Sequence, residues 1–194
     1  MYTPKGRVGQ RRYGGRFFEE FLPALQGRQG IEMYKQMAEN DSVVGAILFA
    51  VEMLVRQVRF DVEPASDEER DFRAAKFVEQ CMNDMSVSWQ DTLSELLSFL
   101  TYGFSYHEIV YKRRLGARNG SQSSRYSDGL IGWRDFPVRA QDSLVRWEYD
   151  DGDELIGMVQ AAPPDFEERF IPLDKAIDLR TKSRKANPEG VSIL

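Results

Sequence analysis

An apolar stretch at residues 43–55 limits what this chain can fold into more than any other part of the sequence. Its hydrophobic residues occupy all sides of a helix, with only Gly45 and Glu52 interrupting them. A helix that is apolar all round has to be buried all round. We therefore expect it either at the centre of a core or at a subunit interface. It is too short to cross a bilayer, which takes about 20 residues.

The segments next to this stretch also carry helical patterns. Ile31, Tyr34 and Met37 share one face of a short helix, and Asp41 is placed to cap the apolar helix. The pairs Ser66/Glu69 and Ser88/Asp91 have capping-box spacing and predict two further helix starts. The inner stripes of these two helices are Phe72, Ala75, Val78, Met82 and Met85 in the first, and Leu93, Leu96, Leu97 and Leu100 in the second. A left-handed C-cap is expected at Gly103.

Alternating polar and apolar residues predict strands, most of them in the second half of the chain. Val58, Phe60 and Val62 alternate with polar residues before Pro64, which predicts a half-buried strand. Asp151-Gly152 lies between two strand-like runs and predicts a hairpin. The remaining predicted strands cover 104–111, 130–136, 144–149 and 155–160, with one further strand or turn in 170–179, while 116–129 has the composition of a long flexible hairpin loop. Helices precede strands, so the fold class is α+β, a helical amino-terminal half followed by antiparallel β hairpins.

The chain divides into an arm and one domain on these patterns. Residues 1–30 are basic and glycine-rich without a regular period, and we expect a flexible arm there. Such an arm is either a solvated terminus or a segment that contacts a neighbouring subunit or nucleic acid. Residues 31–194 form the expected α+β domain.

Composition excludes several classes of protein. A net charge of -5 and a pI near 5.1 do not fit a dedicated nucleic-acid binder, although an average charge says nothing about one face. The single cysteine, Cys81, can form neither an internal disulfide nor a Cys-rich zinc site, and its helical setting predicts a small buried hydrophobe. The start of the chain has no apolar core of signal-peptide length, and we expect no membrane association.

The sequence shows no cluster of residues suited to catalysis. The one histidine, His107, is followed by Glu108 in a predicted strand, where neighbouring side chains face opposite ways. The acidic run Asp150–Glu154 lacks the bidentate glutamate that follows in a calcium loop. We therefore predict no catalytic, cofactor-binding or metal-binding residue, no cofactor and no enzymatic activity.

One loop is a candidate for nucleic-acid binding. The cations Lys112, Arg113, Arg114, Arg118 and Arg125 gather there, and Tyr126 could stack on a base. The alternative is an ordinary solvated, charged loop. The residues that bind nucleic acid, if any do, stay undecided.

Several motifs in a fixed order resemble the portal proteins of tailed bacteriophages. The first runs from Met33 to Asp41 into the apolar helix and on to a segment ending at Pro64. The second is the run Leu96–Tyr111, which contains Gly103-Phe104-Ser105 followed by a Glu-Ile strand. Two later family motifs are resembled by Ile171-Pro172-Leu173-Asp174-Lys175 and by Asn187-Pro188-Glu189-Gly190-Val191-Ser192-Ile193-Leu194. The resemblance covers residues 31–194 and is greatest to Mu-like portals.

This resemblance implies the amino-terminal wing region of a portal, in a chain that stops before the stem, clip and tunnel loop of its relatives. A portal subunit forms a ring, typically of twelve copies, at one capsid vertex. The ring is the conduit for DNA packaging and ejection and connects head to tail. The implied partners are other copies of the chain, the major capsid protein, the terminase large subunit, neck or tail connector proteins and the viral DNA. The implied location is the virion, with assembly in the host cytoplasm. The alternative is a small phage or host protein-interaction module that forms no ring.

Overall fold

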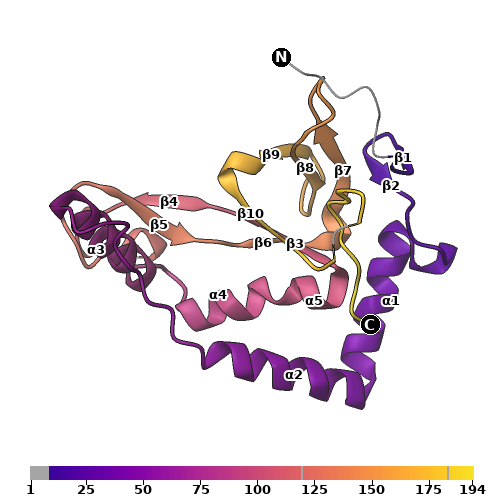
Figure 1. The fold of residues 1–194 in the computed structure, drawn as a ribbon, viewed down its shortest axis with the longest axis horizontal. Coiled ribbons are helices and arrows are strands. Elements are labelled where there is room, and N and C mark those ends of the chain that lie inside the picture. Colours follow the sequence, from indigo (N-terminus) through magenta and orange to yellow (C-terminus); the bar gives the residue numbers. More distant parts are fainter. Residues whose placement is uncertain (1–8, 119, 183) are drawn as a thin grey trace. The chain divides into compact units, whose positions relative to one another are not determined.

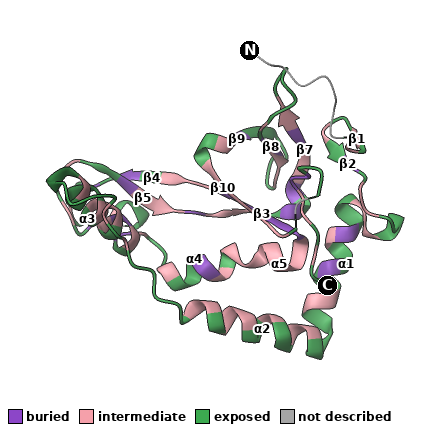
Figure 2. Ribbon diagram, in the orientation of Figure 1, coloured by how far each residue is buried: buried purple, intermediate pink, exposed green. Residues whose placement is uncertain are grey.

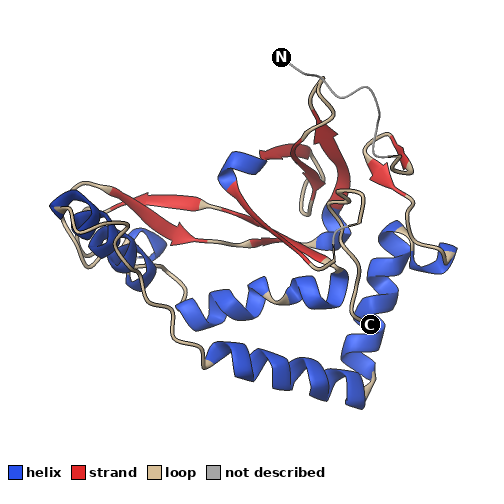
Figure 3. Cartoon of the chain, in the orientation of Figure 1, coloured by secondary structure: helices blue, strands red, loops and turns tan. Residues whose placement is uncertain are grey.

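The computed structural model of the chain describes residues 9–118, 120–182 and 184–194. The chain separates into two compact units. The described residues up to Phe49, together with Leu96–Glu108 and Val138–Leu194, make up unit 1, and Ala50–Glu95 and Ile109–Pro137 make up unit 2. The fold is α+β, as predicted, with helices and antiparallel sheets (Figure 3).

The helices of unit 1 agree in part with the sequence prediction, because the single helix predicted from Ser88 through Leu100 is divided into Trp89–Leu96 and Ser98–Tyr102. Helix α1 spans Gly27–Asn40 and so begins before the predicted face at Ile31. Helix α2, Ser42–Arg56, starts in unit 1 and ends in unit 2. Its predicted cap is confirmed, because Asp41 Oδ1 accepts hydrogen bonds from the backbone N–H of Val43 at 2.8 Å and of Val44 at 3.1 Å. Helix α5, Ser98–Tyr102, ends at Gly103, whose φ of 90° is the predicted left-handed cap.

Unit 1 holds two three-stranded antiparallel sheets (Figure 1). In the first, β3 (Phe104–Glu108) lies between β10 (Ala176–Arg180) and β6 (Val138–Arg139). In the second, β8 (Leu155–Ala161) lies between β7 (Leu144–Tyr149) and β9 (Glu168–Pro172). The predicted hairpin between β7 and β8 is confirmed. Residues 170–179 supply parts of two strands rather than one, joined by the 3₁₀ turn Leu173–Lys175.

The core of unit 1 is aromatic. Trp147, on β7, is 1% exposed, and the rings of Phe104 and Tyr106 pack edge-on against it at centroid distances of 5.5 and 5.8 Å. Met158 and Ile171 complete this side of the core. Tyr106 also donates a hydrogen bond to the Ile171 carbonyl at 2.9 Å, which satisfies its buried hydroxyl.

The segment predicted as an arm contributes to this core. Its described part folds into the short hairpin of β1 (Arg12–Tyr13) and β2 (Arg16–Phe17), the 3₁₀ turn Pro23–Leu25 and the start of α1. Phe17 is 5% exposed and belongs to the core cluster. Burial of the Phe17 side chain holds the neighbouring backbone in place. The basic residues and glycines of this segment gave no sign of that burial. Residues 1–8 lie outside the described chain, and the predicted boundary at residue 30 stays a prediction.

Unit 2 contains α3 (Glu69–Asn83), most of α4 (Trp89–Leu96) and the paired strands β4 (Val110–Arg113) and β5 (Ile131–Asp135). The capping pair at the start of α4 is confirmed, because Ser88 Oγ accepts from the Asp91 N–H at 3.1 Å and donates to its carboxylate at 2.6 Å. Helix α3 starts only at Glu69, since Ser66 Oγ bonds the Asp71 carboxylate instead, at 2.5 Å.

The strand predicted at residues 58–62 is wrong. The chain is irregular there, and no described strand pairs with it. Alternation creates a strand only where a neighbouring strand supplies backbone hydrogen bonds. Phe60 instead packs edge-on against Trp89 at a centroid distance of 5.8 Å. The predicted strand 104–111 is likewise divided into β3 and β4 at Ile109.

Of the two settings expected for α2, the centre of a core is wrong, and a subunit interface stays a prediction. None of its residues is buried, and Val43, Ile47 and Leu54 are 66%, 57% and 67% exposed (Figure 2). Helical spacing places these three with the exposed Ala46 and Ala50 on one face. We call the five residues Val43, Ala46, Ile47, Ala50 and Leu54 the α2 stripe.

Candidate functional site

The basic loop after β4 is the predicted nucleic-acid site, and the structure turns two of its cations inward. Lys112 is 4% exposed, because alternation along β4 points its side chain at α3. Its ammonium group donates to the carbonyls of Asp84 and Ser123 and lies 3.4 Å from Asp84 Oδ2. Lys112 is therefore part of the packing of unit 2 and is not available to a phosphate.

Arg114 is the second inward cation. It is 1% exposed, and its Nη2 contacts Gln80 Oε1 at 2.8 Å and Asp128 Oδ2 at 2.9 Å. Its guanidinium carbon lies 4.0 Å from the ring centroid of Tyr126 and 5.0 Å from that of Phe77. Tyr126 thus packs on Arg114, and its possible role as a base-stacking ring stays a prediction.

Asp84, at the end of α3, fastens the loop to the helix. Its carboxylate accepts from the Arg125 backbone N–H and from Ser124 Oγ, each at 2.7 Å. Burial opposes ionisation of this carboxyl, but the two hydrogen bonds and the charge of Lys112 outweigh it and hold the pKa of Asp84 below its usual value. The loop predicted as flexible is therefore tied down by buried, charge-assisted contacts.

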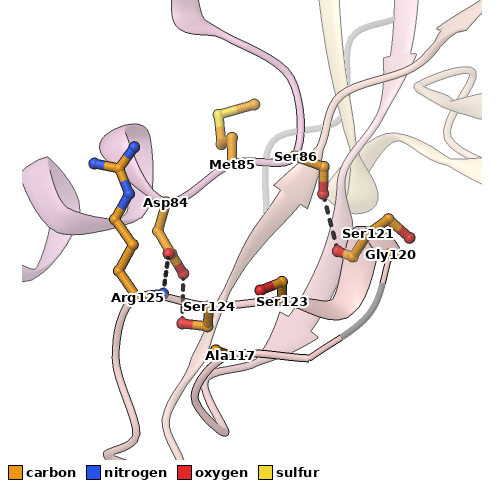
Figure 4. Close-up of a pocket in the computed structure, with 9 residues that line it drawn as sticks. All are labelled: Asp84, Met85, Ser86, Ala117, Gly120, Ser121, Ser123, Ser124 and Arg125. Carbon is orange, nitrogen blue, oxygen red and sulfur yellow. Dashed lines mark hydrogen bonds between the residues drawn. The ribbon is translucent and has the colours of Figure 1, made fainter.

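An open pocket of about 570 Å³ lies between the end of α3 and this loop. Figure 4 shows Ser86 bonded across it to the Ser121 carbonyl, at 2.9 Å, and Ser124 bonded to Asp84. The side chains of Arg113, Arg118 and Arg125 are exposed in this part of unit 2. These three cations remain available to a phosphate, and nucleic-acid binding by this loop stays a prediction.

His107 lies in the middle of the β10–β3–β6 sheet, opposite Ile177 and Val138, with no exposed surface. Glu108 forms an ion pair with Arg139. Solvent and substrate do not reach the imidazole, so its position is that of a structural histidine.

The acidic hairpin between β7 and β8 uses its carboxylates to close the turn. Asp150 Oδ1 accepts from the N–H groups of Gly152 and Glu154 at 2.9 and 2.8 Å, and Asp153 pairs with Arg12. Across the described chain, no three His, Cys, Asp or Glu side chains are grouped to hold a metal ion. The same residues include no helix with the length and hydropathy of a membrane span.

Two sequence motifs that are far apart in the chain meet in unit 1. Gly190 has a φ of 60°, and a Cβ there would lie 2.2 Å from the Gly103 carbonyl oxygen. Ile193 N–H and Ser192 Oγ donate to the carbonyls of Leu100 and Thr101 at 3.1 and 2.6 Å. The final segment is thereby held against the end of α5, and only glycine permits so close an approach of the two backbones.

Two carboxyl groups of unit 1 are held in a poorly solvated setting. Burial raises the pKa of Asp178 to about 6, although Arg180 lies 3.0 Å away and opposes the rise. Burial also raises the pKa of Glu189 to about 7, while a hydrogen bond from Trp147 Nε1, at 3.2 Å, acts against it. Asp178 lies across the sheet from Tyr106, and Glu189 contacts Trp147, so both carboxyls adjoin the aromatic core.

A second exposed apolar face lies on the β4–β5 ladder, and the sequence analysis missed it. Pairing of Tyr111 with Trp133 and of Arg113 with Ile131 places these side chains on the face opposite Lys112 and Arg114. We call Tyr111, Arg113, Leu115, Ile131 and Trp133 the hairpin face. Its signal in the sequence is the alternation of side chains from Tyr111 to Leu115, which continues past the end of the strand into the basic loop.

The comparison with known families covers both motifs that meet at Gly103. A family model described as the portal protein of Mu bacteriophage matches residues 31–194. No curated protein sequence matches the chain. The matched residues include α1, α2, the Gly103 motif and the final segment that packs on it. Because the match covers most of the chain, the chain belongs to the portal protein family of Mu bacteriophage, a family of structural proteins of the phage capsid.

Proposed function

We propose that this chain is a ring-forming portal subunit at one vertex of the phage capsid. The ring acts as the conduit for DNA packaging and ejection and as the connection between head and tail. Its partners are further copies of the chain, typically twelve in a ring, with the capsid protein, the terminase large subunit, connector proteins and the DNA in the channel. Assembly takes place in the host cytoplasm.

The α2 stripe is the observation that carries this proposal. A surface helix normally turns its polar face to water, whereas α2 turns five apolar residues outward. Burying one valine, leucine or isoleucine side chain stabilises an assembly by roughly 1.5–3 kcal/mol. Contiguous apolar surface of this kind marks an interaction site, and a closed ring needs such a surface on every subunit.

The test is the mass of the assembled chain in solution. We expect the purified chain to sediment as a closed multimer at high concentration, visible as rings by negative-stain electron microscopy. Ile47→Asp places a charge in the centre of the stripe and should yield folded monomers, because Ile47 is 57% exposed and contributes little to the core. Circular dichroism confirms that the variant is folded.

The matched control is Lys76→Asp, which introduces the same side chain at an exposed position of α3. This control should assemble as the parent chain does. If Ile47→Asp forms rings as well as the parent chain does, the α2 stripe is not part of the ring interface. A chain that binds a phage or host protein but stays monomeric at every concentration would favour an interaction module without a ring.

A further inference from the structure

We propose that the α2 stripe of one copy packs on the hairpin face of the next copy. This inference rests on the proposed ring and names the two surfaces that close it. A cyclic assembly requires two different faces of each subunit to meet. The α2 stripe and the hairpin face are two different apolar surfaces, one helical and one formed by strands.

The hairpin face is the uncovered face of the two-stranded β4–β5 sheet. The other face of β4–β5 is covered, because Lys112, Arg114 and Gly132 are buried on it. On the outer face, Tyr111 and Ile131 are 48% and 60% exposed. A helix laid on this face would remove the exposed Tyr111 and Ile131 side chains from water.

The dimensions of the two surfaces agree. The stripe runs from Val43 to Leu54, about 16 Å along a helix axis at 1.5 Å per residue. The face runs from Tyr111 to Leu115, about 14 Å at 3.4 Å per residue. One helix of this length covers both strands of the ladder.

The charges agree as well. Arg113 is exposed in the middle of the hairpin face, and within the described chain no carboxylate pairs with it. Two exposed carboxylates precede the stripe, Glu39 at the end of α1 and Asp41 at the cap of α2. Tyrosine, tryptophan and arginine are the residues that dominate protein interfaces, and the hairpin face contains all three. An acidic helix end therefore meets a basic, aromatic sheet face.

Cross-linking of two singly substituted chains tests this contact between copies. Ile47→Cys and Ile131→Cys chains are mixed and treated with a short bismaleimide. Cys81 is only 3% exposed, so the parent chain is the control for background reaction. We expect a dimer band on a denaturing gel that requires both substituted chains. Addition of excess parent chain, without either new cysteine, before cross-linking should weaken this band at least tenfold.

A second variant measures the contact without a new thiol. Ile131→Asp should dissociate the rings as Ile47→Asp does, and should keep the circular dichroism of the parent. Two results together would overturn the pairing of these faces while leaving the portal function intact. They are normal rings from Ile131→Asp and no dimer band from the mixture of Ile47→Cys and Ile131→Cys chains. A dimer band from the Ile47→Cys chain alone would show that the α2 stripes of two copies contact each other, and this result would also overturn the proposed pairing. A parent chain without any rings contradicts the proposed function itself.

Discussion

Neutralising Asp178 should stabilise the folded chain at alkaline pH. The Asp178 side chain is 5% exposed in β10, across the sheet from Tyr106, with Arg180 Nη2 3.0 Å from its carboxylate. Burial raises its pKa from 3.8 to about 6, so the desolvation free energy of the charged carboxylate exceeds its favourable interaction with Arg180. The substitution Asp178→Asn keeps the shape of the side chain and removes this charge.

The sign and size of the effect follow from proton linkage. Because the folded pKa is raised, the stabilising contribution of the protonated carboxyl is complete below the unfolded pKa and is lost as pH rises through the folded pKa. Each pH unit between the two pKa values corresponds to about 1.4 kcal/mol, which gives about 3 kcal/mol in total. Asp178→Asn should therefore exceed the parent in free energy of unfolding by about 3 kcal/mol at pH 8 and by almost nothing near pH 4.

Urea unfolding followed by Trp147 fluorescence measures this difference in unit 1. Trp89 and Trp133, both in unit 2, are replaced by phenylalanine in every chain so that only Trp147 reports. Asp174→Asn is the matched control, since Asp174 is an exposed aspartate four positions earlier in the chain. A gain for Asp178→Asn that is equal at pH 4 and pH 8, or a loss at pH 8, would refute the reasoning.

Three further substitutions test other contacts. Glu189→Gln should raise the melting temperature at pH 8 by about 10 °C, because it removes a carboxylate with a pKa near 7 and keeps an acceptor for Trp147 Nε1. Gly190→Ala should lower the free energy of unfolding by at least about 2 kcal/mol in urea titrations, because its Cβ would meet the Gly103 carbonyl. Lys112→Met should cost about 3 kcal/mol in the same assay, because it leaves the buried Asp84 carboxylate without its cation.

Each of these has a result that contradicts it. The gain in Glu189→Gln should disappear at pH 4, where the parent carboxyl is protonated, and a gain that persists there would have another cause. Gly129→Ala is the control for Gly190→Ala, since its Cβ would meet nothing within 4 Å. Equal losses in both variants would assign the effect to the positive φ alone. Arg113→Met, on the exposed face of β4, should change stability by less than about 0.5 kcal/mol.

Local patterns in the sequence determined several of the helix ends. Asp41 and Ser88 cap α2 and α4 as predicted, and Gly103 ends α5. These features depend on hydrogen bonds and backbone angles within a few residues, so the chain near each position specifies them. The Asp151-Gly152 hairpin was predictable for the same reason.

Tertiary structure decided which side of each element meets water. The alternation in β4 was visible in the sequence, but only the packing of α3 assigns Lys112 and Arg114 to the interior and Arg113 to the surface. Residues 58–62 alternate as well, yet no strand lies beside them and they stay irregular. The α2 helix formed as its sequence required, while the exposure of its stripe depends on what packs around it. Helix formation is satisfied by the chain's own neighbouring backbone, whereas burial and strand pairing need partners that are distant in the sequence or belong to another copy.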